Sequence, residues 1–130
     1  MTTSRPPTQR SHYRRRHRLS GRAAYTRVFQ QGVRRATGPL AVRVLPNGLP
    51  YPRLGLSVPK RVGNAVRRNR IKRLIREAFR LSQHDWPRGY DVLMIVRPHR
   101  PATLADYQRL LSALVRKAHH TWEKMSSNHD

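Results

Sequence analysis

Two stretches in the first half of the chain alternate apolar and polar residues, as half-buried β-strands do. Every second residue is apolar from Leu40 to Leu45, and again from 53 to 58. The segment between them, Pro46-Asn-Gly-Leu-Pro50, has the composition of a turn. We therefore expect the two strands to pair as a hairpin, with the small residues Gly55 and Ser57 on the face that points away from the core.

Three other segments repeat apolar residues at helical spacing. Ser20 is placed to cap the first helix, which we expect to run to about Gln31 and to stop at Gly32. The second helix is expected from about 64 to 81, with Ile71, Leu74, Ile75, Ala78 and Phe79 on its core face. The third follows Thr103 and Asp106, whose spacing resembles a capping box. Its apolar face comprises Leu104, Tyr107, Leu111, Leu114, Val115 and Ala118.

A short, continuous apolar run from Val92 to Val96 follows a predicted turn at 87–89. Such a run is typical of a central strand that is covered on both faces. The order of elements predicts an α/β (α+β) two-layer sandwich with one small mixed sheet packed by helices, to which a further short strand can belong. We expect a disordered basic tail at 1–18, a single domain at 19–122 and a frayed C-terminus at 123–130. The tail is not expected to pack on the domain.

The charge of the chain narrows the choice of partner. The 130 residues include 28 Lys and Arg against six Asp and Glu, a net charge of +22, and 24 of the 28 basic residues are Arg. Nine of them fall within 60–80, where Glu77 is the only acid. Because a solvated face would mix the two signs of charge, this density on a predicted helix indicates a polyanion, RNA or DNA, as the partner.

The sequence contains no recognisable catalytic or metal-binding pattern. The six acids are scattered, whereas a two-metal nuclease needs several carboxylates that converge on the ions. The adjacent His119 and His120 would point about 100° apart on a helix, so we expect surface histidines and not ligands. Asp91 is expected to pair with an arginine. With no cysteine, no apolar secretory segment and no run long enough to span a membrane, we expect a cytoplasmic protein that binds no membrane.

Two aromatic residues in the first helix have two interpretations. Tyr25 and Phe29 are four residues apart and therefore share one face. They are either core anchors or a stacking platform for unpaired bases, each of which can contribute about 1–3 kcal/mol. If the hairpin forms as expected, Arg43 joins Ser57 on the open face of the sheet, and a basic groove suited to single-stranded RNA results.

The segment that follows Leu54 carries a long motif. After the strand it fits K-x-x-G-x-A-V-x-R-N-R-x-K-R-x-x-R-E, with the central R-N-R at Arg68, Asn69 and Arg70. This pattern resembles the bacterial ribonuclease P protein subunit. The resemblance extends from about Leu19 to Val115 and includes Gly89-Tyr-Asp91, which opens the apolar strand, and Arg97-Pro98, which follows it.

The resemblance implies a left-handed β-α-β crossover and a partnership with ribonuclease P RNA, which removes the 5′ leader of precursor tRNA with magnesium ions held mainly by the RNA. It implies one protein per RNA and no catalytic or metal-binding residue in this chain. The residues implied to bind the catalytic RNA are Lys60, Arg61, Arg68, Asn69, Arg70, Lys72, Arg73 and Arg76. Those implied to form the leader groove are Tyr25, Phe29, Arg43 and Ser57. Many family members have an aromatic residue where this chain has Arg43, which favours a phosphate contact there.

Two other hypotheses remain. Composition alone favours a structural RNA-binding protein, such as a ribosomal protein, over a subunit of a ribonucleoprotein nuclease. The motif around Arg68 makes the nuclease subunit the favoured hypothesis. A nuclease made of protein alone is disfavoured because the acids do not cluster.

Overall fold

The computed structural model describes residues 15–86 and 89–127. Within them the chain forms three helices and four strands, joined by three single turns of 3₁₀ helix. The helices are α1 (Arg22–Gln31), α2 (Ala65–Ser82) and α3 (Leu104–Ser127). The strands are β1 (Val33–Thr37), β2 (Leu40–Pro46), β3 (Arg53–Ser57) and β4 (Tyr90–Val96), and the short turns are η2 (Arg15–His17), η3 (Lys60–Val62) and η4 (Gln83–Asp85).

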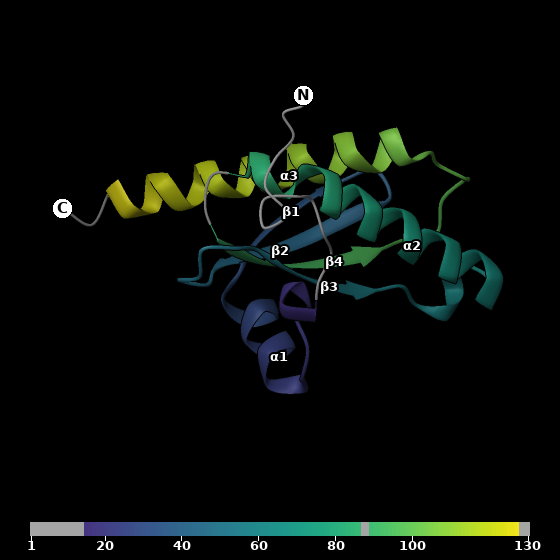
Figure 1. Cartoon of the computed structure of the whole chain (residues 1–130), viewed down its shortest axis with the longest axis horizontal. Helices are drawn as coiled ribbons and strands as arrows, with labels where there is room; N and C mark the ends of the chain where they lie inside the picture. Colours follow the sequence, from purple (N-terminus) through teal and green to yellow (C-terminus); the bar gives the residue numbers. More distant parts are fainter. Residues whose placement is uncertain (1–14, 87–88, 128–130) are drawn as a thin grey trace, which may run out of the picture.

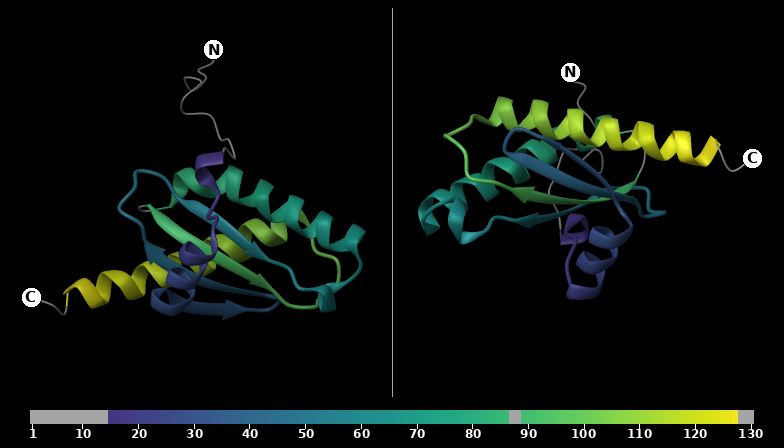
Figure 2. Two further views of the ribbon diagram at one scale, coloured as in Figure 1. Left: turned by 90° about the horizontal axis from the view of Figure 1, so that it is seen from below. Right: turned by 180° about the vertical axis from the view of Figure 1, so that it is seen from behind.

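The strands form one mixed sheet in the order β1-β2-β4-β3. Both β1 and β4 run antiparallel to β2, while β3 runs parallel to β4. Helices α2 and α3 lie together on one face, and α1 lies against the other (Figures 1 and 2). The predicted sandwich with a small mixed sheet is therefore confirmed. The β3–α2–β4 unit is the crossover that the resemblance predicts to be left-handed.

The predicted hairpin between 40–45 and 53–58 is wrong. In the structure β4 separates β2 from β3, because its almost fully buried side chains suit the centre of the sheet. The hairpin that does form joins β2 to β1. The sequence did not predict β1 as a strand, because the adjacent Arg34 and Arg35 interrupt the alternation of apolar and polar residues. The turn after Pro46 instead passes the start of β4, where the backbone N–H of Asn47 donates to the backbone carbonyl of Gly89.

The main core lies between the sheet and helices α2 and α3. It contains the predicted apolar faces of both helices, including Ile75, Phe79 and Leu114, together with residues of β2, β3 and β4, and Val33 of β1 packs against its edge. A second, smaller cluster of Leu19, Val28 and Leu93 attaches α1 to the opposite face. Asn64 caps α2 through the Arg67 N–H, and the expected exchange of hydrogen bonds between Thr103 and Asp106 begins α3.

The segment before α1 packs on the domain, so the predicted tail at 1–18 extends too far. Residues 15–20, here called the strap, run beside β3, where the Leu19 N–H donates to the Leu54 carbonyl. His17 is buried against the rings of Tyr51 and Phe79. The part of the predicted tail at 1–14 lies outside the described residues.

The ends of two helices also differ from the prediction. Ser20 does not cap α1, because the helix begins one residue later than expected and no side chain caps its first turn. The chain turns at Gly21, which is the N-cap and has a φ of 92° that favours glycine. At the other end, α3 continues to Ser127, beyond the expected limit at 122, and residues 128–130 lie outside the described part. None of the helices in the described residues combines the length and apolar character that crossing a bilayer requires.

A buried carboxylate joins three segments on the face that carries α1. Asp91 in β4 is fully buried, and both of its oxygens accept hydrogen bonds of 2.7 Å from Arg53 in β3. The Asn47 side-chain amide also donates to Asp91, at 3.0 Å. Arg27 in α1 lies 3.8 Å from the same carboxylate. The expected pairing of Asp91 with an arginine is thus confirmed, and this pair raises the pKa of Arg53.

Replacing Asp91 by Asn should destabilise the fold by roughly 3 kcal/mol, because Arg53 and Asn47 would lose a charged acceptor at a site shielded from water. Glu77→Gln is the matched control, since Glu77 forms a largely exposed pair with Arg80 on α2 and should contribute less than about 1 kcal/mol. Urea unfolding of both variants tests this expectation. Equal losses would show that the Asp91 network is no more than another surface pair.

Removing residues 1–18 should also lower stability, by about 1–3 kcal/mol, because the truncation exposes the Tyr51 and Phe79 surfaces that His17 covers. A chain that begins at Arg15 keeps these contacts and serves as the control. Thermal melting of the two truncated chains measures the difference. Identical melting temperatures would mean that the strap contributes nothing to the fold.

Candidate RNA-binding surface

Helix α2 presents a cationic surface because most of its large apolar residues turn toward the core, although Val66 and Leu81 near its two ends are exposed. Ile71, Ile75, Ala78 and Phe79 are buried. Among the predicted RNA-binding residues of the helix, Asn69, Arg70 and Arg73 are exposed, whereas Arg68, Lys72 and Arg76 are half-buried. The remaining two, Lys60 and Arg61, are exposed on η3, the turn that precedes the helix.

The half-buried cations of α2 form one row, since Arg68, Lys72 and Arg76 are spaced four residues apart. The Nε atoms of Arg68 and Arg76 are shielded from solvent and have no hydrogen-bond partner in the described part of the chain. Buried donors in folded proteins are normally paired, so these two groups are suited to an external acceptor. Arg67, by contrast, is used internally, because it donates to the Val62 and His99 carbonyls.

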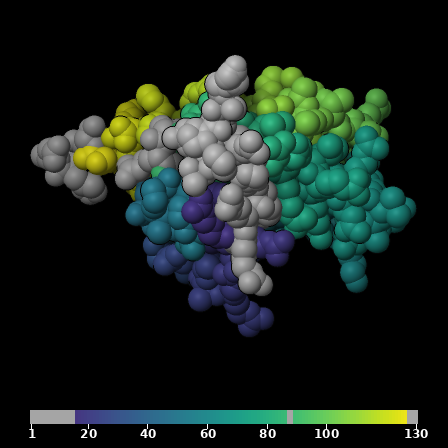
Figure 3. Space-filling model, viewed as in Figure 1, coloured from purple at the N-terminus to yellow at the C-terminus, as the bar shows by residue number. Residues whose placement is uncertain are grey.

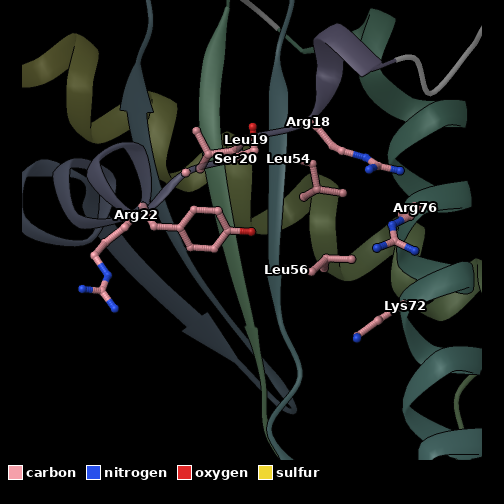
Figure 4. Close-up of a pocket in the computed structure, with 10 residues that line it drawn as sticks. Arg18, Leu19, Ser20, Arg22, Leu54, Leu56, Lys72 and Arg76 are labelled. Atoms are coloured by element: carbon pink, nitrogen blue, oxygen red, sulfur yellow. The ribbon is translucent and has the colours of Figure 1, made fainter.

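A cavity of about 600 Å³ separates this row from the strap. Arg18, Lys72 and Arg76 point into it from opposite sides, while Arg22 points away (Figure 4). Its floor is apolar, with Leu54 and Leu56 of β3. The lining residues are Arg18, Leu19, Ser20, Gly21, Arg22, Tyr25, Leu54, Leu56, Lys72 and Arg76. We call this space the cationic cavity; its cations and apolar floor suit a phosphate and a base.

A second hollow lies between α1 and the sheet, and we call it the α1 groove. It encloses about 350 Å³ and is lined by Tyr25, Thr26, Phe29, Gln30, Ser57, Leu93 and Ile95. The Phe29 side chain is 48% exposed, and the Arg43 guanidinium lies 4.5 Å from the centre of its ring. The four residues predicted for a groove are therefore close together, three in the lining and Arg43 against Phe29.

Tyr25 connects the two hollows, because its side chain lines both of them. Its ring rests on β3 at Gly55, where an added Cβ would lie only 2.9 Å from the Tyr25 hydroxyl. The absence of a side chain at Gly55 thus allows the ring to reach the sheet. Val28, on the adjoining face of α1, is fully buried and anchors the helix, so Phe29 is not needed as a core anchor.

Helix α1 stands out from the body of the protein as a separate ridge (Figure 3). Helices α1 and α2 border a surface with few free carboxylates, because Asp91 is buried against Arg53 and Glu77 is paired with Arg80. The hydrogen bond from Arg80 lowers the pKa of Glu77. No group of three or more potential metal-ligating side chains occurs in residues 15–86 and 89–127. The chemistry that this surface offers is binding of a polyanion and stacking of bases.

Sequence reasoning missed several lining residues. Arg18 was assigned to a disordered tail, and the position of the strap depends on contacts of His17 with residues far along the chain. Thr26 and Gln30 follow from the face shared by Tyr25 and Phe29, and a helical projection would have found them. Leu93 and Ile95 required the knowledge that β4 is central, with its odd-numbered residues under α1.

His119 is not simply a surface residue, as the sequence suggested. Its Nδ1 atom lies 2.7 Å from the hydroxyl of the buried Tyr90, so it helps to close the core beneath α3. Its neighbour His120 is exposed and lies on another side of the helix.

Comparison with known proteins identifies the family. The family model described as Ribonuclease P matches residues 13–122. A ribonuclease P protein component from Syntrophus aciditrophicus is 41% identical over 101 residues, which cover 77% of this chain and 85% of that protein. One from Photobacterium profundum is 37% identical over 103 residues, covering 78% and 81% of the two chains.

Solved structures give the same assignment. The RNase P protein of Staphylococcus aureus superposes with a TM-score of 0.69 at 33% identity, covering 78% of this chain and 94% of that one. The RNase P protein of Thermotoga maritima gives 0.68 at 32% identity, with 76% and 96% covered. The chain therefore belongs to the bacterial ribonuclease P protein family, whose members are the protein component of the endoribonuclease that processes the 5′ end of tRNA.

Proposed function

We propose that this chain binds two RNA segments at once within ribonuclease P. The α2 row and the cationic cavity bind the catalytic RNA, and the α1 groove binds the 5′ leader of precursor tRNA. The observation that carries the proposal is the position of Phe29, whose ring is 48% exposed in the α1 groove and lies against the guanidinium of Arg43. An exposed ring in an open groove suits an unpaired base, and the adjacent cations suit phosphates.

Tyr25 gives the two binding regions a common boundary. Since its side chain lines both hollows, the two hollows are direct neighbours, and an RNA strand that leaves the α2 surface would reach the α1 groove by passing the Tyr25 ring. In this arrangement the protein holds the leader at a fixed place relative to the catalytic RNA. Fixing one part of the substrate helps to orient the bond that is cut, which is a contribution that requires no catalytic side chain.

The described residues include no group of three or more side chains that could hold a metal ion, and three of the acids are engaged elsewhere. Asp91 is buried against Arg53, Glu77 is paired with Arg80, and Asp106 caps α3. We therefore propose that the magnesium ions are held mainly by the RNA and that no step depends on a metal ion bound to this chain. We also propose that one copy of this protein binds each catalytic RNA and that the complex acts in the cytoplasm.

Reconstitution tests the proposed function directly. The purified protein is mixed with a precursor tRNA, with and without ribonuclease P RNA, and removal of the leader is followed. Cleavage that requires the RNA and improves with the protein is expected. Binding without any effect on processing would favour the structural RNA-binding alternative, and cleavage without the RNA would favour a nuclease made of protein alone.

Replacing Arg70 by Gln should weaken binding to ribonuclease P RNA without unfolding the protein, because Arg70 is exposed and lies away from the buried stripe of α2. If it contacts one phosphate, the slope of log K against log salt should fall by about one. Arg109→Gln on α3 removes the same charge from an arginine already paired with Asp106 and is the control. An unchanged slope for Arg70→Gln, or a lost circular dichroism signal, would exclude the proposed contact.

Replacing Phe29 by Ala should weaken binding of precursor tRNA to the reconstituted enzyme by about 1–3 kcal/mol, the contribution of one stacked base. Mature tRNA lacks a leader, so its affinity should stay the same. Stability should fall by less than about 1 kcal/mol, since an exposed ring leaves no cavity.

Met125→Ala is the matched control for this variant, because Met125 is similarly exposed (44%) and lies on α3, away from the groove. Affinities for both tRNAs and the urea midpoint are measured on each variant. If Phe29→Ala impairs binding of precursor and mature tRNA alike and lowers the free energy of unfolding by about 3–5 kcal/mol, Phe29 is a core anchor and the groove assignment is wrong.

A further inference from the structure

Two arginines face each other across the edge strand β1 and its neighbour β2. The register of β1 and β2 places Arg34 directly opposite Arg43, so both side chains project from the same face, the one that carries α1. Like charges at directly opposed positions destabilise a sheet. Within residues 15–86 and 89–127 neither guanidinium forms an ion pair with a carboxylate that would relieve the repulsion.

Arg43 is held in place but its hydrogen-bonding capacity is not used. The Phe29 ring lies under its guanidinium at 4.5 Å, and the side chain is half-buried. Its Nε atom is shielded from water and has no acceptor among the described residues. A guanidinium that is stacked on a ring, with free N–H groups and a second cation opposite, is suited to an anion with several acceptor oxygens, and phosphate is such an anion.

The floor of the α1 groove continues toward these arginines. Ser57 and Ile95 of the groove lie in register with Ala41 of β2, which pairs in turn with Ala36 of β1. Neither alanine has a bulky side chain, although Ala41 is itself buried, and both lie next to the row that contains Arg43 and Arg34. An RNA strand that follows this floor would pass along both guanidinium groups.

We propose that Arg34 and Arg43 together bind a single phosphate of the leader, next to the nucleotide whose base stacks on Phe29. The leader groove then extends across the whole sheet to the edge formed by β1. This inference rests on the proposed binding of the leader in the α1 groove and adds Arg34, which the sequence did not indicate. The ligand is the phosphate backbone, so the contact does not depend on the sequence of the leader.

The test measures binding of precursor tRNAs to the enzyme reconstituted with ribonuclease P RNA, using leaders extended one nucleotide at a time. For the unaltered protein, affinity should rise with leader length until the strand reaches β1. Arg34→Gln should bind short leaders normally and lose on the order of tenfold in affinity for longer ones. Arg34→Lys should recover only part of the loss, because it keeps the charge but not the planar fork.

A second measurement locates the phosphate. Single leader phosphates are replaced, one at a time, by uncharged methylphosphonates. One position should weaken binding to the unaltered protein and have a clearly smaller effect on Arg34→Gln, in which only Arg43 still contacts that phosphate; such non-additivity in a double-mutant cycle is the signature of a direct interaction. Arg116→Gln removes the same charge from an exposed residue of α3, on the other face of the sheet, and should respond like the unaltered protein.

The outcomes separate this inference from the proposed function. If Phe29→Ala discriminates precursor from mature tRNA but Arg34→Gln does not, the two-arginine site is overturned and leader binding in the groove stands. If neither variant discriminates, leader binding itself fails. If Arg34→Gln weakens mature tRNA equally, the arginine contacts another RNA segment and the inference is wrong. The urea midpoint of Arg34→Gln should be equal to or higher than that of the unaltered protein, because a repulsion is removed; a lower midpoint would make Arg34 a structural residue.

Discussion

The mutual repulsion of the cations is the constraint on which the arrangement of this protein depends. A net charge of +22 on 130 residues opposes any compact state. The few acids are therefore placed where they hold segments together. Asp91 is the only buried acid in the described residues, and it connects β3, β4, the turn at Asn47 and, through Arg27, helix α1. Within single helices, Asp106 accepts a hydrogen bond from the Thr103 N–H at the start of α3, and Glu77 accepts one from Arg80 in α2.

This placement of the acids leaves whole surfaces with positive charge only. The α2 row, the cationic cavity and the pair of Arg34 and Arg43 have no carboxylate among their described neighbours that would neutralise them. In the free protein such clusters raise the free energy of the folded state, and a bound polyanion lowers it again. Binding of RNA should thus stabilise the fold by mass action in addition to forming the functional complex.

The parts of the fold that depend on local pattern could be predicted from the sequence. The apolar stripe of α2, its cap at Asn64, the capping box at Thr103 and the central position of β4 all follow from spacing and residue type. Strand pairing could not be predicted, because alternation shows which face of a strand is buried but not which strand lies beside it. The hairpin between β2 and β3 was inferred from closeness in sequence, and the more apolar β4 occupies that place instead.

The RNA-binding surface likewise contains residues that local sequence patterns predict and residues that only long-range contacts bring into place. The motif around Arg68 and the shared face of Tyr25 and Phe29 are local, and the groove residues lie together as predicted. Arg18 and Arg34 could not be found in this way, because the strap and the β1–β2 register bring them to the surface through long-range contacts.

The division of the sheet into two unequal faces explains how so small a protein can have both a core and an extended binding surface. Helices α2 and α3 cover one face with apolar residues from every strand, and that core is sufficient to leave the other face largely open. Helix α1 needs only Leu19, Val28 and Leu93 to attach to this second face. Because its anchor is small, most of α1 remains available as the wall of a groove. Two residues of the sheet help to position α1 on this face: Gly55 leaves space for the Tyr25 ring, and the buried carboxylate of Asp91 lies 3.8 Å from Arg27.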